Sequence, residues 1–290
     1  MNKKHIVSAC KGVIIIVLQC MAAIQVLILI GTSPVLFDKL SFNVLDYLEV
    51  VVDVSMKIYT LQELTFEGVP LFPIVMARYA DTMKILGAGI ATAFVLSSLN
   101  AYIALLVFRR RLRQVIKALD VFEAIPDVMI IVLLQIGVIA VYKSTGIKLA
   151  QVVTVGSQDQ TILLPILCIS IPVSFFLTKV LIQYVLEELD KRYILLARSM
   201  GFSFFYILNV HVIRNITDAL FGVSKTIFYS MLSTLMVVEY LFNLNGLLSL
   251  VFSTSNSEVF SVSCIVLFVP FFILYRTYDG ISSFIRKEKM

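Results

Sequence analysis

Residues 12–31 read GVIIIVLQCMAAIQVLILIG and contain no charged side chain. About 20 mostly apolar residues are enough for an α-helix to cross a lipid bilayer. Hydrocarbon offers no hydrogen-bond partner to an open backbone, so such a run must span as a helix or as part of a closed barrel. A barrel strand would alternate apolar and polar residues, and this run does not. The stretch therefore predicts a membrane-spanning helix.

Further windows of the same kind follow along the chain, at residues 85–108, 126–142, 161–183, about 219–241 and 260–276. The composition agrees, with 59% hydrophobic residues, 15% charged residues and a mean hydropathy of +0.95. Soluble domains carry about 25% charged residues. The basic start resembles the first part of a signal peptide, but the apolar run is too long and no A-x-A site follows. We therefore expect an all-α membrane protein with about six transmembrane helices, the first one uncleaved.

The basic residues predict the orientation of these helices. Of the 24 Lys and Arg residues, 16 lie in the amino terminus, the segments after spans two and four, and the carboxyl end, whereas five lie in the alternate loops. Cytoplasmic loops carry the excess of positive charge. Both termini are therefore expected in the cytoplasm, with an even number of spans. The pI near 8.9 follows from this topology and does not indicate a nucleic-acid partner.

The sequence divides into three regions. Residues 1–31 form the amino-terminal tip and first span, residues 32–82 an extracellular loop region, and residues 83–290 the core, which includes a long cytoplasmic loop at 184–218. The extracellular region holds seven acidic residues against three basic ones, and its frequent apolar positions predict that it folds against the helices. Two interpretations stay open for its charge, a solvated cap or a vestibule that attracts cations.

The cytoplasmic loop has the pattern of two short helices joined at a glycine. Residues 186–201, LEELDKRYILLARSMG, repeat apolar or small residues at helical spacing, namely Leu189, Tyr193, Leu196, Ala197 and Met200. Gly201 stands where a helix C-cap glycine is expected. Ser203 can cap a second helix that runs to about Asn215.

This loop carries a resemblance to a known family. Residues 193–215, YILLARSMGFSFFYILNVHVIRN, resemble the signature loop of permease subunits of bacterial binding-protein-dependent ABC importers, in particular the dipeptide, oligopeptide and nickel class. The matching positions are Tyr193, Ala197-Arg198, Gly201, His211, Arg214 and Asn215. Weaker matches follow in order along residues 80–250, at Asp81-Thr82, Ile125-Pro126-Asp127, Leu164-Pro165, Val237-Val238-Glu239, Phe242 and Asn245-Gly246.

The resemblance implies the type I importer permease fold and a place in a larger complex. Its partners would be a second permease, usually a different chain, two cytoplasmic ATPase subunits, an extracellular substrate-binding protein and the lipid bilayer. The chain would lie in the bacterial inner or plasma membrane. The loop would be the coupling helix that docks on an ATPase subunit, and the residues assigned to docking are Tyr193, Leu196, Ala197, Arg198, Met200 and Gly201. Ala197 would permit close approach, Arg198 would reach acidic groups of the partner, and Gly201 would supply the sharp break.

The remaining polar residues have weaker assignments. His211, Arg214 and Asn215 are expected to hold the loop together. Ser97, Ser98, Asn100 and Glu239 lie in spans, where they either line the pathway or gate or bond between helices. Lys84 and Lys179 are expected to reach the membrane surface or to pair with loop acids. Small residues are expected on helix-packing faces, at Gly87, Ala91 and Gly137.

The chain lacks the motifs of an enzyme. It has no G-x-x-x-x-G-K-[ST] phosphate loop, no H-E-x-x-H and no G-x-S-x-G. The four cysteines form no C-x-x-C pair and are interpreted as small hydrophobic residues rather than metal ligands. We expect no catalytic residue, no metal site and no cofactor in this chain, with ATP and Mg bound by the partner subunits. Transported peptides are the first expectation for the cargo, and nickel or a metal chelate is the alternative.

Two functions of other classes remain. An ion-coupled secondary transporter would need acidic residues at mid-membrane, and the spans between residues 85 and 183 carry almost none. A membrane scaffold without transport activity would have no use for the pattern at 193–215.

Overall fold

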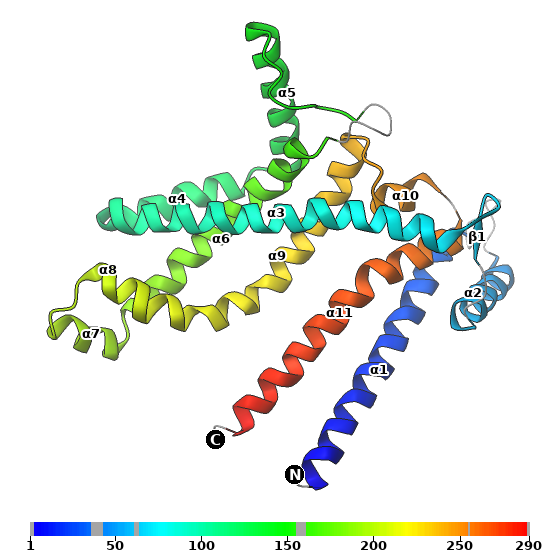
Figure 1. The fold of residues 1–290 in the computed structure, drawn as a ribbon, viewed down its shortest axis with the longest axis horizontal. Helices are drawn as coiled ribbons and strands as arrows, with labels where there is room; N and C mark the ends of the chain where they lie inside the picture. Colours follow the sequence, from blue (N-terminus) through cyan, green and yellow to red (C-terminus); the bar gives the residue numbers. More distant parts are fainter. Residues whose placement is uncertain (1–2, 36–42, 61–63, 155–160, 255, 289–290) are drawn as a thin grey trace. The chain divides into compact units, whose positions relative to one another are not determined.

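The structure, a computed structural model, describes residues 3–35, 43–60, 64–154, 161–254 and 256–288, except for the side chains of 3–11, 218 and 279–288. Figure 1 shows its long helices, joined by short ones. In chain order the elements are α1 (Lys3–Gly31), α2 (Val44–Tyr59), β1 (Thr65–Phe66), β2 (Val69–Pro70), α3 (Leu71–Val107), η2 (Arg109–Arg111), α4 (Leu112–Glu123), α5 (Asp127–Thr145), α6 (Leu163–Leu189), α7 (Arg192–Ser199), α8 (Phe204–Tyr206), η3 (Ile207–Val212), α9 (Ile213–Leu241), α10 (Leu247–Ser253) and α11 (Ser257–Glu288).

Six helical segments in the described ranges are long and apolar enough to cross a membrane. They are Gly12–Val35, Leu71–Val107, Asp127–Thr145, Leu163–Leu189, Ala219–Leu241 and Ser257–Tyr278. Each overlaps one of the windows predicted from the sequence, so the expected all-α architecture with six spans is confirmed.

The second span begins earlier than the sequence predicted. α3 starts at Leu71, although the apolar window started at residue 85. Arg78, Asp81 and Lys84 ended that window because they are charged, yet charge alone does not break a helix. Pro73 is no obstacle either, since it lies in the first turn, where proline has no intrahelical hydrogen bond to lose.

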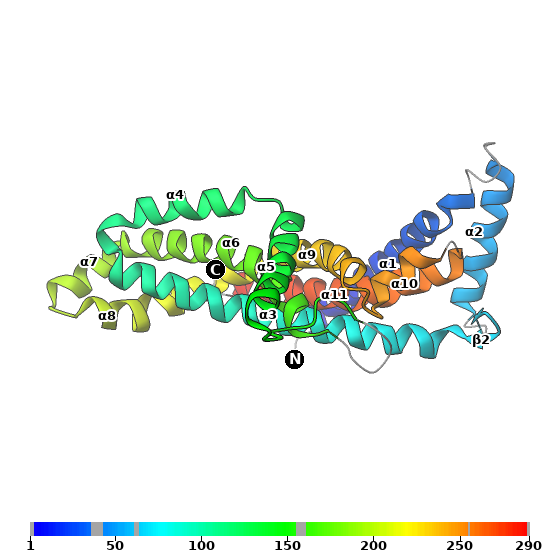
Figure 2. The ribbon, with the colours of Figure 1, turned by 90° about the horizontal axis from the view of Figure 1, so that it is seen from above.

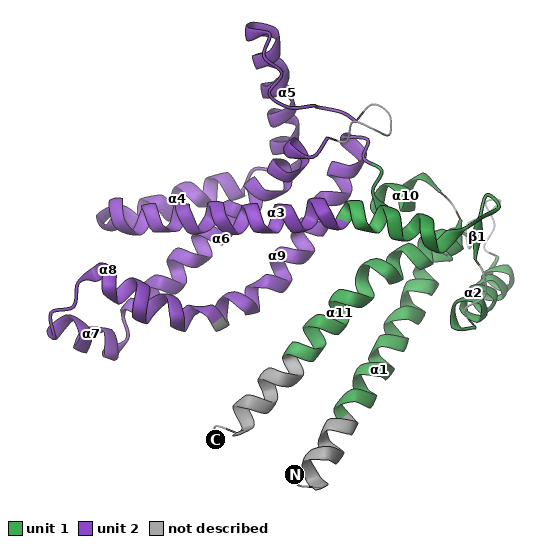
Figure 3. Cartoon of the chain, in the orientation of Figure 1, with its two compact units in different colours: residues 1–82, 245–290 green, residues 83–244 purple. Residues whose placement is uncertain are grey.

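The chain divides into two compact units, coloured separately in Figure 3. Unit 1 consists of residues 1–82 and 245–290, and unit 2 of residues 83–244. The boundary at residue 82 coincides with the predicted start of the core region. Residues 245–290 were predicted to belong to the core region 83–290. In the structure they form one compact unit with residues 1–82.

In unit 1 the described part of the predicted outer loop folds against the long helices. α2 packs on α1, and the Tyr47 hydroxyl donates to the Leu29 carbonyl at 3.0 Å. Lys57 of α2 makes ion pairs with Asp53 at 2.8 Å and with Glu258 of α11 at 2.7 Å. Hydrogen bonds to these two carboxylates raise the pKa of Lys57. The expectation that this region folds against the helices is thus met for residues 43–60. Two of its seven acids, Asp38 and Glu63, lie outside the described residues.

The core of unit 2 joins the helices that flank the predicted cytoplasmic loop. α6 packs along α9, and α4 lies alongside α6 in both views (Figures 1 and 2). Lys179 of α6 makes ion pairs with Asp120 at 2.9 Å and Glu123 at 2.5 Å, both on α4, so the predicted pairing with loop acids is confirmed. The buried residues of this core come from α3, α4, α6, α7, η3 and α9, and they are Ala101, Ala104, Leu105, Leu112, Leu177, Leu181, Ile182, Val185, Leu189, Ile194, Ala197, Ile207, Leu208, Val212 and Ile216.

α3 approaches α6 closely at Gly89, which was not among the predicted packing residues. A Cβ atom there would lie 2.3 Å from Cδ1 and 2.7 Å from Cγ1 of Ile169, a fully buried side chain. At Gly87 and Gly137, by contrast, a Cβ would meet no described atom within 4 Å. These two predicted packing glycines therefore make no close helix contact inside the described chain.

Gly89→Ala is expected to destabilise unit 2 by about 1–3 kcal/mol, because the buried Ile169 has no room to move away from the added methyl group. Gly87→Ala is the matched control. It adds the same methyl group two residues earlier, into open space, and should leave stability unchanged or raise it by up to about 1 kcal/mol. Thermal unfolding of the purified chain in detergent measures both. Equal midpoints for the two variants would contradict the close contact.

Candidate functional site

The predicted loop forms a compact tip at one end of unit 2, where α7 and α8 connect α6 to η3 and α9 (Figure 1). α7 begins at Arg192, three residues after α6 ends at Leu189. The turn between them consists of Asp190, the C-cap of α6, and Lys191, the N-cap of α7, whose backbone is extended. The tip is therefore a continuation of the two long helices rather than a freely hanging loop.

A glycine-dependent turn ends α7. Gly201 has a φ of +85°, in the left-handed region that L-residues rarely adopt. Its N–H donates to the Arg198 carbonyl at 3.0 Å, and the Phe202 N–H donates to the Ala197 carbonyl at 3.3 Å. These two bonds are the pair that defines a Schellman motif, which satisfies carbonyls that the end of a helix leaves open. The predicted helix end at Gly201 is confirmed.

The second helix of the tip starts as predicted but does not end there. The Ser203 hydroxyl accepts from the Tyr206 N–H at 3.3 Å, so Ser203 is the N-cap. The predicted end near Asn215 is wrong. The chain remains helical through η3, a π-helical segment, into α9 and reaches Leu241. No glycine or proline lies between residues 203 and 221, so nothing in the sequence stops the helix.

α7 is amphipathic, but the residues that the spacing placed on one face lie on two. Ile194 and Ala197 are buried in the core of unit 2, at 0% and 4% exposure. Leu196 and Met200, which the spacing placed with Ala197, are instead 61% and 60% exposed. The short helix turns only one side toward the core, and Ile194 and Ala197 lie on that side. Ala197 thus permits close packing of α7 on its own chain, and it is not available at the surface for a partner.

The outward side of the tip is apolar. Besides Leu196 and Met200, the large exposed apolar and aromatic side chains of this segment are Leu195, Phe202, Phe205 and Tyr206. We call these six residues the tip surface. Arg198 is exposed beside them. A cluster of apolar side chains around one cation is typical of a protein-binding surface rather than of a solvated loop.

A buried carboxylate fixes α7 to both long helices. Glu188, near the end of α6, is almost fully buried and accepts hydrogen bonds from the Tyr193 hydroxyl and from Asn215 Nδ2 at 3.2 Å. Lys191 makes an ion pair with its other oxygen at 2.6 Å. Asn215 Nδ2 also donates to the Tyr193 hydroxyl at 2.8 Å. Tyr193 and Asn215, both predicted site residues, are thus brought together, and one side chain of α6 holds them.

Two groups of this network have raised pKa values. The hydrogen bond to the Glu188 carboxylate raises the pKa of Lys191, and burial, with the same carboxylate, raises the pKa of the Tyr193 phenol. Both groups hold their protons more tightly in the folded chain. Their contribution to stability is therefore complete below their ordinary values, about 10, and is lost only as the pH rises above them. The network is intact over the whole neutral range.

Glu188 was missed in the sequence, although a signal was present. It lies three residues after Val185 and next to Leu189, in the stripe of α6 that continues the buried Leu181 and Ile182. An acidic residue in an apolar stripe must find partners when it is buried. The prediction placed residues 184–218 in a cytoplasmic loop and therefore assigned no buried position to Glu188.

His211 and Arg214 complete the predicted loop residues. The His211 ring lies among three aromatic rings of the tip, with centroids at 5.8 Å from Tyr206 and 6.5 Å from both Tyr193 and Phe202. This arrangement fits the structural role expected for it. Arg214 is exposed on α9.

A contact from outside the loop also holds the tip. The Arg109 guanidinium lies 4.0 Å from the centroid of the Phe204 ring, which places η2 against α8. Cation–π pairs of this kind contribute about 0.5–2 kcal/mol. This contact could not be predicted from the sequence, because residues 109 and 204 are far apart in the chain.

The predicted pathway residues are scattered. Ser97 is fully buried, and its hydroxyl donates to the Phe94 carbonyl of its own helix at 3.0 Å. Ser98 is half-buried and Asn100 is exposed. Glu239 is fully buried near the end of α9. These four side chains do not form one lining.

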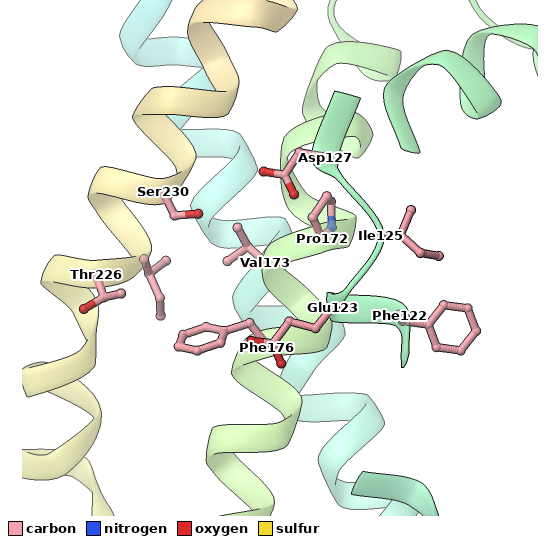
Figure 4. A pocket seen from close by; sticks show the side chains of 10 residues that line it. Phe122, Glu123, Ile125, Asp127, Pro172, Val173, Phe176, Thr226 and Ser230 are labelled. Atoms are coloured by element: carbon pink, nitrogen blue, oxygen red, sulfur yellow. The ribbon is translucent and has the colours of Figure 1, made fainter. Parts of the chain in front are cut away.

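Figure 4 shows a cavity in unit 2 with a volume of about 160 Å³. It lies where the end of α4, the start of α5, α6 and α9 meet. Polar groups of Glu123, Asp127, Thr226 and Ser230 share its wall with apolar side chains, and Pro172, a proline inside α6, forms part of the lining. Asp127 is fixed by a hydrogen bond of 2.5 Å from the Thr234 hydroxyl. None of the four predicted pathway residues lines it.

The comparison with known families agrees with this arrangement. A family model described as "Binding-protein-dependent transport system inner membrane component" matches residues 95–281, which is more than half of the chain. The matched stretch contains α4 to α10, including the tip, Glu188 and the cavity. No curated protein sequence gave a significant match.

Proposed function

The chain belongs to the family of inner membrane components of binding-protein-dependent transport systems, and from that premise we propose that it forms one half of the translocation pathway of an ABC importer for peptides. Its membership makes it a multi-pass ABC transporter permease, and the expected type I permease fold is confirmed. The direction of transport, the cargo and the composition of the complex belong to the proposal.

One observation supports the coupling role above all others. The tip surface presents six exposed apolar or aromatic side chains on a short helix and the turn after it, at the point where two long helices end. Exposed apolar residues inside the spans would face lipid, but these residues lie between the spans, where the partner has to be a protein. We propose that a cytoplasmic ATPase subunit covers this surface, with Leu196 and Met200 as its apolar anchors and Arg198 as the cation that meets acidic groups.

Coupling requires that a push on α7 moves the spans. α7 packs inward through Ile194 and Ala197, and Glu188 connects it to α6 and, through Asn215, to α9. A displacement of α7 would therefore move two membrane helices together instead of being absorbed by a loop. Closure of an ATPase dimer on ATP could then shift the permease between inward-open and outward-open states, each stabilised by its own contacts.

The remaining parts of the complex follow from the same proposal. Two ATPase subunits would bind ATP and Mg, a second and different permease chain would form the other half of the pathway, and an extracellular binding protein would deliver the cargo. Both termini would lie in the cytoplasm of a bacterial cell. Peptides are proposed because of the resemblance at residues 193–215, and nickel or a metal chelate is the alternative.

For the pathway itself we propose the cavity beside Pro172. The Asp127 carboxylate and two hydroxyls among apolar side chains suit a cargo with an amino group and a mixed surface, whereas Glu123 is already paired with Lys179. The exposed Asn100 and the half-buried Ser98 remain proposed pathway residues. Glu239, buried at the end of α9, remains a proposed gate residue.

The experiment that tests the coupling role is co-purification of the ATPase subunit encoded with this chain. Leu196→Glu places a charge in the centre of the tip surface and is expected to reduce the bound ATPase at least tenfold, because an interface anchor is replaced by an unpaired charge. Val121→Glu on α4 is the control, since Val121 is equally exposed at 67% but lies outside the tip surface. Equal ATPase recovery with both variants would refute the docking role of α7.

A further inference from the structure

The end of α3 changes from apolar to cationic within one surface hollow of about 470 Å³. Three apolar residues and three arginines line it in sequence order, namely Leu106, Val107, Phe108 and Arg109–Arg111. All three apolar side chains are at least 42% exposed. Val107 is the last residue of the second candidate span, so the hollow lies at the end of its apolar stretch, directly before the arginines.

The acidic side chains that the structure describes do not neutralise the positive charge of this region. Arg113 and Lys117, four residues apart on the exposed side of α4, extend the arginine run to five cations within nine residues. The acids that follow on α4 are already bound, since Asp120 and Glu123 both make ion pairs with Lys179. Within the described ranges none of the five cations makes an ion pair, and Arg109 is occupied by the Phe204 ring.

We propose that this hollow binds an anionic phospholipid. The guanidinium groups of Arg110 and Arg111 hold the phosphate, and the acyl chains lie against Leu106 and Val107. Guanidinium groups bind phosphate oxygens through paired, charge-assisted hydrogen bonds. Basic clusters directly next to a membrane helix attract anionic lipids, which are concentrated on the cytoplasmic side.

A phospholipid fits better than an acidic protein surface. A protein partner would match the arginines, but Leu106 and Val107 are the last residues of the apolar candidate span, which lipid surrounds in a membrane. A lipid matches both halves of the hollow. Its acyl chains match the apolar residues at the end of the span, and its phosphate matches the arginines that follow them. The inference requires that α3 spans a membrane with Arg109–Arg111 on the cytoplasmic side, and it does not depend on the proposed transport function.

The chain contains no tryptophan, so a single introduced one reports on its own surroundings. Phe108→Trp places the reporter in the hollow, and Leu133→Trp places a control reporter on the exposed side of α5. Each full-length chain is reconstituted into phosphatidylcholine vesicles that contain brominated phosphatidylglycerol or, alternatively, brominated phosphatidylcholine. Quenching of the tryptophan measures the relative affinity of the two lipids at that site.

Phosphatidylglycerol is expected to be preferred several-fold at position 108 and not at position 133. Adding Arg110→Gln and Arg111→Gln should bring the preference at position 108 close to one, and this pair leaves the Arg109–Phe204 contact intact. Lys143→Gln with Lys148→Gln removes the same charge away from the hollow and should change nothing. Lipid counts by native mass spectrometry on the tryptophan-free chain, with and without the arginine pair, give an independent measurement.

Three outcomes would overturn the proposal. The first is equal quenching by both lipids at position 108, and the second is a preference that survives the loss of both arginines. The third is a preference abolished by millimolar glycerol phosphate or by the purified ATPase subunit, which would show that the cluster binds a soluble anion or a protein.

Discussion

Gly201→Val is expected to separate the chain from its ATPase partner while the membrane helices stay folded. At a φ of +85° a non-glycine residue costs about 1–2 kcal/mol, and a β-branched side chain costs more. The turn would relax toward a negative φ and give up the two hydrogen bonds that close α7, from the N–H groups of Gly201 and Phe202. Met200 and Phe202 would then leave their places on the tip surface. ATPase recovery should fall at least tenfold.

Gly201→Asn is the control that assigns the cause. A Cβ at position 201 would meet no described atom within 4 Å, so the chain itself has room for a side chain there. Asparagine tolerates the left-handed region and should retain most of the ATPase. Loss of binding in both variants would mean that the partner needs the empty space at position 201. Retention in both would show that the bend is not required, and the coupling proposal would then be in serious doubt.

The fold was predictable because hydrophobic length is a local property. Each span can be recognised from about 20 consecutive apolar residues. In a bilayer such a segment must be helical whatever its distant contacts are, because its backbone groups have to be hydrogen-bonded within the segment. The early start of α3 at Leu71 was not predictable in this way. Charged residues such as Arg78 and Asp81 end an apolar window, yet they continue a helix without difficulty.

The candidate site was predictable only where backbone geometry depends on one residue. Gly201 and Ser203 each have a local reason to occur at a helix end, and both lie where the sequence placed them. The spacing placed Ala197 on one face with Leu196 and Met200, which is wrong, because a helix of eight residues offers two faces of similar hydrophobicity. Only the core of unit 2 decides that Ile194 turns inward and Leu196 outward. Glu188 of α6 makes hydrogen bonds with Tyr193 of α7 and Asn215 of α9, and contacts between three helices cannot be predicted from sequence spacing.

Glu188→Ala is expected to loosen the tip without unfolding unit 2. The substitution removes the acceptor shared by Tyr193, Asn215 and Lys191, and hydrogen bonds to a charged group contribute about 1.5–3 kcal/mol. The local cost should be near the lower end of that range, because the Lys191 side chain is 56% exposed and can return to water. α7 would then open more often, and trypsin should cut after Arg192 or Arg198 about tenfold faster, in proportion to the open population.

Glu187→Ala is the matched control for this loosening, since it removes the same charge one residue earlier from an exposed position. Glu188→Gln separates charge from hydrogen bonding, because glutamine keeps an acceptor for Tyr193 or Asn215 but loses the ion pair with Lys191. We expect its cleavage rate to lie between those of wild type and Glu188→Ala, and ATPase recovery to follow the same order. If Glu188→Ala instead lowered the melting temperature of the whole chain with no selective cleavage at the tip, the carboxylate would be a general support of the core. Its proposed role in transmitting the movement of α7 to α6 and α9 would then fail, because that role requires the tip to respond before the helices do.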